Sequence, residues 1–206
     1  MIITDILKDK KHQAKVIFDN GEAVLWDLDL FSEVPLKKGD EITEEKLLEL
    51  NEKSEFLRAK SRALWCLDRA PYSEKGLYDK LITARFSPKT AAAVIKRLKE
   101  LGLVDDVRYA ERLCEYFKDS NVSKRETYHK MLLKGLPKEV INDALSNCEI
   151  DELSQIKTLL SKKYKNKMES KEDTQKVYAS LIRKGFSYSA VKEALKNYTE
   201  DTDWEE

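Results

Sequence analysis

Three stretches of this 206-residue chain repeat one another: "DKLITARFS" (79–87), "KMLLKGLP" (130–137) and "SLIRKGFS" (180–187). They align at a spacing of fifty residues without a gap, and the alignment extends to both sides with apolar residues in one register. The matched sets are Tyr78, Tyr128 and Tyr178; Leu81, Met131 and Leu181; Ile82, Leu132 and Ile182; Phe86, Leu136 and Phe186; Ala91, Ile141 and Val191; Val94, Ala144 and Ala194; and Ile95, Leu145 and Leu195. Self-similarity at a fixed period is the signature of a repeat protein.

Each repeat has the pattern of two helices joined by a tight corner. Leu81 and Ile82 follow the repeated tyrosine by three and four positions, which places the three side chains on one face of a helix. Residues 91–98 show the same spacing and predict the next helix. In the second and third repeats, Gly135 and Gly185 can end the first helix in a left-handed conformation.

The corner of the first repeat differs, because Arg85 stands where the others have glycine. This predicts a corner that costs more free energy or is built differently. Ser87 and Ser187 are predicted N-caps of the helices that come next, and Pro137 suits the first turn of its helix. The acidic pair at 105–106 is interpreted as the N-cap of a further helix rather than as a pair of catalytic carboxylates.

A third helix is predicted upstream of each pair, over roughly 55–69, 106–118 and 151–165. A three-helix unit of about fifty residues buries too little surface alone and should stack on its neighbours. We therefore predict a mainly α protein in which three tandem three-helix repeats form an elongated, curved array. The predicted segments are a strand-rich extension (1–42), a linking helix plus repeat 1 (43–106), repeat 2 (107–149), repeat 3 (150–198) and an acidic tail (199–206).

The first part of the chain predicts a small antiparallel β meander. Residues 2–8, 13–18 and 22–31 alternate apolar and polar side chains, as half-buried strands do. An Asn-Gly pair at 20–21 supplies the positive φ angles that a tight hairpin turn requires. So small a meander should pack on the helical part of the chain or act as an appendage. Thr43 is the predicted N-cap of the linking helix.

The charge is balanced overall but unevenly spread. The chain has 38 basic and 38 acidic residues. Residues 1–54 have a net charge of −5, residues 55–198 have +10, and the tail has five acidic residues and no basic one. The balanced total gives no global reason to expect a nucleic-acid or membrane partner, but the basic middle keeps an electrostatic role open.

The residues offer no catalytic or metal site. Cys66, Cys114 and Cys148 are odd in number and far apart, which argues against a disulfide framework or zinc site and fits a reducing cytoplasm. His12 and His129 have no partners at metal-ligand spacing, and no phosphate loop or nucleophile elbow is present. No apolar run suggests a signal peptide or a membrane span. We expect a cytoplasmic protein that is not an enzyme and uses no cofactor or metal.

The repeated tyrosines allow two interpretations. Their rings could stack on the bases of a single-stranded nucleic acid. Alternatively, each packs into the core of its repeat with the hydroxyl at the edge, since it shares a helix face with apolar residues. We favour the second interpretation.

Basic residues recur at the same spacing and are the candidate partner-binding residues. One interpretation is a solvated face, and the other is a track for an anionic polymer, either nucleic acid or an acidic protein filament. The candidates are Arg58, Arg62, Lys80, Arg108, Arg112, Lys130, Lys134, Lys162 and Lys184.

Several segments resemble a known family. "ALWCLDRAPYSEKGLYDKL" (63–81), "GLVDDVRYAERL" (102–113) and the "KGL" and "KGF" corners are similar, in order and spacing, to the RecX family of recombination regulators. The resemblance covers about 55–198. The Asn-Gly hairpin and the acidic tail resemble the longer members from low-GC Gram-positive bacteria.

The resemblance implies a fold, a partner and an action. RecX proteins are built of tandem three-helix repeats and bind the RecA recombinase filament on single-stranded DNA. The resemblance implies inhibition of filament extension, ATP hydrolysis, strand exchange and SOS co-protease activity by a protein that is not an enzyme. We expect this protein to be a monomer. The alternative is a helical-repeat protein that binds DNA or RNA directly, without a recombinase.

Overall fold

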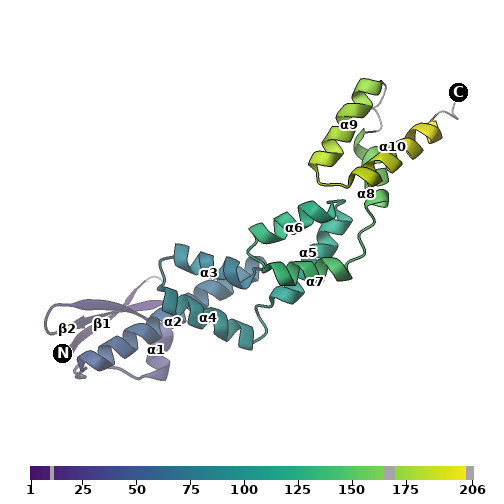
Figure 1. The fold of residues 1–206 in the computed structure, drawn as a ribbon. Helices are drawn as coiled ribbons and strands as arrows, with labels where there is room; N and C mark the ends of the chain where they lie inside the picture. Colours follow the sequence, from purple (N-terminus) through teal and green to yellow (C-terminus); the bar gives the residue numbers. More distant parts are fainter. Residues whose placement is uncertain (10–11, 165–169, 203–206) are drawn as a thin grey trace. The chain divides into compact units, whose positions relative to one another are not determined.

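The computed structural model describes residues 1–9, 12–164 and 170–202, the last four by their backbone alone. Three strands, ten α-helices and one turn of π-helix follow one another over these residues (Figure 1). The chain divides into two compact units, Met1–Val104 and the residues from Asp105 onward. Among the described helices, none is both long and apolar enough to cross a membrane.

The first unit begins with the predicted antiparallel meander. Its strands are β1 (Ile3–Asp9), β2 (Gln13–Phe18) and β3 (Ala23–Asp27), paired in the order β1-β2-β3. The turn between β2 and β3 has Gly21 at a φ of 81°, but Asn20 does not have a positive φ, so the predicted type I′ turn with two positive φ angles is wrong. The turn is closed by a hydrogen bond from the Phe18 N–H to the Glu22 carbonyl.

The prediction that the third strand continues to residue 31 is wrong. The strand ends at Asp27, and the short helix α1 (Leu28–Glu33) comes next. Asp27 is the N-cap of this helix, because its carboxylate accepts a hydrogen bond of 3.0 Å from the Asp29 N–H. The helix turns Leu30 into the core, where it is fully buried. Capping by Asp27 therefore overrides the alternating pattern.

Helix α2 (Glu44–Arg69) is continuous where the sequence predicts a linking helix and a separate helix over 55–69. Thr43 is its N-cap, as predicted, and accepts a hydrogen bond from the Lys46 N–H. The 26-residue segment contains neither glycine nor proline, so nothing in it ends the first helix. Figure 1 shows α2 running from the sheet into the three-helix group.

Two cores lie along α2. The front core joins the sheet, α1 and the first half of α2, and its buried members are Ile3, Val16, Phe18, Trp26, Leu30, Ile42 and Leu50. The meander thus packs on α1 and α2 and is not a loose appendage. The second half of α2 contributes Ala59, Ala63 and Cys66 to the core of repeat 1.

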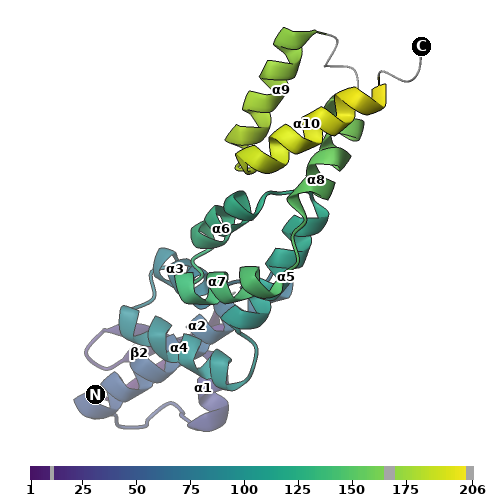
Figure 2. The same ribbon diagram turned by 45° about the vertical axis from the view of Figure 1, so that its right-hand side comes forward.

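Repeat 1 is completed by α3 (Glu74–Thr83) and α4 (Pro88–Glu100). Ser73 caps α3 through a hydrogen bond of 2.9 Å from the Gly76 N–H. Ser87 caps α4, as predicted, by accepting from the Thr90 N–H at 3.3 Å. Figure 2 shows α3 and α4 with α2 in one group.

The corner between α3 and α4 places Arg85 in the left-handed region, at a φ of 67°. Gly135 and Gly185 have φ of 83° and 85° at the matching positions. All three corners therefore have the same backbone conformation. The first corner is therefore not built differently, and its higher free-energy cost stays a prediction, because a left-handed conformation costs a residue with a Cβ about 1–2 kcal/mol.

Replacing Arg85 by glycine should stabilise the protein. Arg85→Gly removes the left-handed strain but adds backbone freedom to the unfolded chain, so we expect a net gain of up to about 1 kcal/mol. Urea denaturation measures it. The control is Ala84→Gly at the neighbouring residue, whose φ of −80° is ordinary. This control should lose about 0.5–1 kcal/mol, and a loss of the same size in Arg85→Gly would contradict the strained corner.

The second unit contains repeat 2, formed by α5 (Asp106–Asp119), α6 (Lys124–Leu133) and α7 (Lys138–Asn147). Asp105 caps α5, as predicted, by accepting from the Arg108 N–H at 3.0 Å. Pro137 differs from its prediction. It is the N-cap of α7 rather than a residue of the first turn.

Repeat 3 consists of α8 (Glu152–Leu159), the π-helical turn η1 (Leu160–Tyr164), α9 (Lys171–Arg183) and α10 (Tyr188–Thr202). The helix predicted over 151–165 is thus continuous from Glu152 to Tyr164, with its last described turn widened to a π-helix. The predicted acidic tail also begins too early, because its first four residues belong to α10. Its last four lie outside the described residues.

Repeats 2 and 3 are joined by two hydrogen-bonded contacts within the second unit. The Ser123 hydroxyl, at the start of α6, donates to the Lys184 carbonyl at 2.6 Å. The buried Gln155 of α8 donates to the Lys118 carbonyl at 3.1 Å and the Val122 carbonyl at 3.3 Å, at and beyond the end of α5. These bonds tie repeat 2 to the corner before α10 and tie α8 to the end of α5 and the segment that follows it.

The repeated tyrosines and the cysteines belong to the interior. Tyr78, Tyr128 and Tyr178 are half-buried, and each packs against the core of its own repeat, which supports the core interpretation. The three cysteines are buried and free. Burial, together with the neighbouring Cys148, raises the pKa of the Cys114 thiol to about 12. Such a thiol is a poor nucleophile.

Candidate partner-binding surface

The structure brings together two of the three basic candidates in the first unit. Arg58 and Arg62 lie one turn apart on α2 and line one cavity of about 530 Å³. Arg62 also lies over the half-exposed ring of Trp65, at 4.4 Å from its centroid. Lys80 stands apart on α3, exposed, with its ammonium 6.0 Å from the centroid of the Tyr72 ring.

Arg108 and Arg112 lie on the exposed face of α5, opposite the buried face of that helix. The guanidinium of Arg108 is 3.8 Å from the Asp105 carboxylate, a long contact at an exposed site. Arg112 makes no ion pair with any residue that the structure describes. The two side chains are therefore available to a partner.

The remaining candidates lie at different depths in the second unit. Lys130 is paired with Glu126 at 3.1 Å and lies 5.5 Å from the Phe117 ring. Lys134 and Lys184 come directly after the last turns of α6 and α9, with Lys134 exposed and Lys184 half-buried. Lys162 is exposed on η1. A continuous basic stripe along the repeats stays a prediction.

The cavity in the first unit contains an arginine that the sequence analysis missed. Arg85 lines it together with Arg58 and Arg62, from the corner between α3 and α4. The sequence could have identified Arg85, because it stands where the other two repeats have glycine. The other walls come from the start of β2, the end of β3 and the outer face of α2.

Glu55, also in this cavity, ties α2 to the start of α4. One carboxylate oxygen accepts from the Ser87 N–H at 2.8 Å, and the other accepts from the hydroxyls of Ser87 at 2.9 Å and Thr90 at 2.5 Å. Burial opposes ionisation of Glu55, but these hydrogen bonds and the charge of Arg58 outweigh it. The pKa of Glu55 therefore lies below its usual value.

In repeat 3, the backbone N–H at the position that matches Ser87 also donates to a carboxylate. Repeat 2 has no backbone N–H at that position. The Ser187 N–H donates to the Glu152 carboxylate at 3.1 Å. Pro137 occupies the matching position in repeat 2 and has no N–H to satisfy. A carboxylate therefore accepts a hydrogen bond at this corner position only in the repeats whose residue there has a backbone N–H.

Removing the charge of Glu55 should destabilise the fold in a pH-dependent way. Glu55→Gln replaces one acceptor oxygen by an amide NH2 group, which cannot accept a hydrogen bond, and it removes the negative charge, so we expect a loss of about 1–2 kcal/mol at pH 7. Because the folded pKa is lowered, the stabilisation is present above the ordinary value of 4.5 and is lost as the pH falls through the folded pKa.

Urea denaturation between pH 7 and pH 3 checks this prediction. The control is Glu52→Gln, about one turn earlier on α2, which removes only an exposed pair with Lys89. It should change stability by at most about 0.5 kcal/mol at any pH. Equal losses in the two variants would contradict the role assigned to Glu55.

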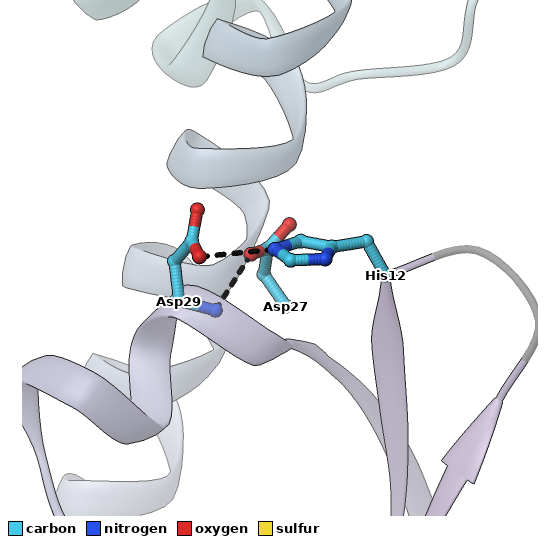
Figure 3. A group of neighbouring side chains, drawn as sticks. All are labelled: His12, Asp27 and Asp29. Atoms are coloured by element: carbon cyan, nitrogen blue, oxygen red, sulfur yellow. Dashed lines mark hydrogen bonds and ion pairs between the residues drawn. The ribbon is translucent and has the colours of Figure 1, made fainter.

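His12 meets two carboxylates that the sequence did not place beside it. Its Nε2 lies 2.9 Å from an oxygen of Asp29, and Asp27 is adjacent (Figure 3). The hydrogen bond to Asp29 raises the pKa of His12. Asp27 is occupied as the N-cap of α1. Pairing and capping account for this group, and it carries no metal assignment.

Two family models match the chain. The model described as "RecX, third three-helix domain" matches residues 149–195, and "RecX, first three-helix domain" matches residues 59–98. These matches coincide with the described helices of repeat 3 and with the helices α2 to α4 of repeat 1.

Relatives extend the similarity to the full length. "Regulatory protein RecX" of Caldanaerobacter subterraneus subsp. tengcongensis is 31% identical over 198 residues, covering 95% of this chain and 98% of the relative. The protein of the same name from Streptococcus gordonii is 32% identical over 211 residues, covering 100% of this chain and 80% of the relative. The front is therefore shared with these relatives as well as the repeats.

Solved structures show the same fold. A crystal structure of regulatory protein RecX superposes with a TM-score of 0.68 at 24% identity, covering 95% of this chain and 98% of that one. RecX from Lactobacillus salivarius gives a TM-score of 0.61 at 22% identity, over 69% of this chain and 96% of that one. The protein is mainly helical, with three-helix domains behind a three-stranded sheet, and it belongs to the RecX family of regulatory proteins.

Proposed function

We propose that this chain binds the RecA recombinase filament on single-stranded DNA and inhibits it. The inhibited steps are filament extension, ATP hydrolysis, strand exchange and SOS co-protease activity. The protein acts in the cytoplasm as a monomer, through surface contacts and without a cofactor. The observation that carries the proposal is full-length similarity to regulatory protein RecX, over 95% of this chain and 98% of the relative.

The exposed basic residues support a contact surface of this kind. Arg112 and Lys162 are exposed and make no ion pair with the described residues, and Arg108 has only a long one. By contrast, Lys118 is paired with Glu115 at 3.3 Å and Lys176 with Asp173 at 2.9 Å, each about one helical turn away. Cations left open in this way suit an acidic partner, because they need not give up an internal pair on binding.

RecA-catalysed ATP hydrolysis on single-stranded DNA tests the proposal. The full chain is titrated into preformed filaments, and the rate of hydrolysis is measured. A fall at substoichiometric ratios is expected, because a molecule that blocks filament growth disables many protomers. An unchanged rate at a molar excess over RecA would overturn the proposal.

Direct nucleic-acid binding is the second candidate function, favoured by the same unpaired cations. Salt dependence separates it from the first. A protein that neutralises several phosphates loses affinity with a log–log slope of about −0.7 per contact on single strands. Binding to an oligonucleotide in the absence of RecA, with a steep slope, would support this candidate. An unchanged ATPase rate together with such binding would make it the leading function.

A further inference from the structure

The cavity of the first unit has an unusual set of charges. Three guanidinium side chains, those of Arg58, Arg62 and Arg85, line a space of about 530 Å³. None of them has a carboxylate within ion-pair distance among residues 1–9 and 12–104. The buried Nε of Arg58 also donates no hydrogen bond within the described chain. An unsatisfied buried donor carries a free-energy cost, so this arginine is held in place without an internal partner for its Nε.

The two carboxylates of the cavity, Glu55 and Asp27, form no ion pair with these arginines and are engaged by other donors. The Glu55 oxygens accept from the Ser87 N–H and from the hydroxyls of Ser87 and Thr90. Asp27 is 3% exposed and accepts from the Asp29 N–H, as the N-cap of α1. Both carboxylates therefore stabilise the fold through these hydrogen bonds, and the cavity has three arginines for two carboxylates.

Arg85 reaches this cavity at an energetic cost. Its φ of 67° places a residue with a Cβ in the left-handed region, where the matching corners have glycine. Backbone strain of this kind is concentrated at functional sites. Here the strained residue is the one that adds the third guanidinium, so the backbone strain and the cluster of positive charge both occur at this cavity.

We infer that this cavity is a binding site for a phosphate group. A guanidinium presents paired donors to a phosphate, and several arginines around one pocket suit a multiply charged oxyanion. The volume is within the range of small-ligand sites and leaves room for an attached group. The phosphate can come from a free ion or nucleotide, or from the backbone of a nucleic acid. The inference does not depend on the proposed RecA interaction, because it concerns the protein alone.

Isothermal titration of the full chain with inorganic phosphate, at pH 7 and constant ionic strength in sodium chloride, tests this. Saturable binding of one phosphate is expected. Arg85→Gln keeps the strained backbone but removes the charge, and should weaken binding at least fivefold. Arg58→Gln/Arg85→Gln should abolish it. The control is Arg97→Gln/Arg183→Gln, which removes two exposed arginines outside the cavity and should stay within twofold of wild type.

The outcomes separate the sources of the phosphate. If oligothymidylate competes with phosphate and the cavity variants lose both ligands, the group belongs to a nucleic acid. If oligothymidylate does not compete, the ligand is a free phosphate or nucleotide. The inference is overturned by the absence of saturable binding, by cavity variants that bind like the control, or by glutamate binding as tightly as phosphate. Circular dichroism of each variant confirms that a loss of binding is not a loss of fold.

Discussion

Reversing both charges on the exposed face of α5, in Arg108→Glu/Arg112→Glu, should weaken binding to RecA filaments at least tenfold. The substitution changes the local charge by four units at a surface proposed to contact an acidic partner. Tenfold corresponds to about 1.4 kcal/mol, which is modest for charged groups at an interface. The fold should persist, because both side chains point away from the core of repeat 2 and exposed substitutions change stability by about 0.5 kcal/mol or less each.

The measurement is half-maximal inhibition of RecA ATP hydrolysis, together with the urea midpoint of each protein. The matched control is Lys138→Glu/Lys192→Glu, which makes the same change in charge on the exposed faces of α7 and α10. It should inhibit like wild type. If the α5 variant inhibits as well as wild type does, this face is not the contact surface.

The second large effect is expected at the joint between repeats 2 and 3. A Cβ built on Gly185 would lie 2.8 Å from the Ser123 hydroxyl oxygen and 3.2 Å from the Arg125 Cβ. The residue also has a φ of 85°. Gly185→Ala therefore combines left-handed strain with overpacking, and we expect a loss of about 2–4 kcal/mol. The Ser123 hydroxyl would have to leave the Lys184 carbonyl to make room.

Gly102→Ala is the control, since Gly102 has a φ of 67° but nothing within 4 Å of an added Cβ. It should lose only about 1–2 kcal/mol, the cost of the left-handed backbone. The difference between the two variants in urea denaturation isolates the packing at the joint. Equal losses would show that α6 does not pack on this corner in solution.

The repeat could be predicted from sequence because each of its features is local. Helix faces follow from apolar spacing, and the corners follow from glycine and capping residues within a few positions. The corner at Arg85 could be predicted for this reason, by comparison with Gly135 and Gly185. The capping of α5 by Asp105 could be predicted in the same way.

The errors arose where one local signal competed with another. The alternating pattern favoured a strand through Leu28 and Leu30, whereas Asp27 begins a helix there. The repeat suggested a helix boundary at residue 55, between Thr43 and Arg69. The backbone has no reason to break at that point, because neither glycine nor proline lies near it.

The cavity could not be predicted, because its parts are far apart in the sequence. Arg58 and Arg85 are 27 positions apart, and they face one space only because α4 packs on α2. The fifty-residue spacing selected Arg58 and Arg62 but not Arg85, which has no basic counterpart in the other repeats. Tertiary packing, not periodicity, assembles this group of charges.

Because α2 is continuous, the sheet and repeat 1 are built on the same helix. Its first half supports the sheet, and its second half is the first helix of repeat 1. The strand-rich front and repeat 1 therefore form one compact unit, Met1–Val104, in which a single unbroken helix carries two adjoining cores.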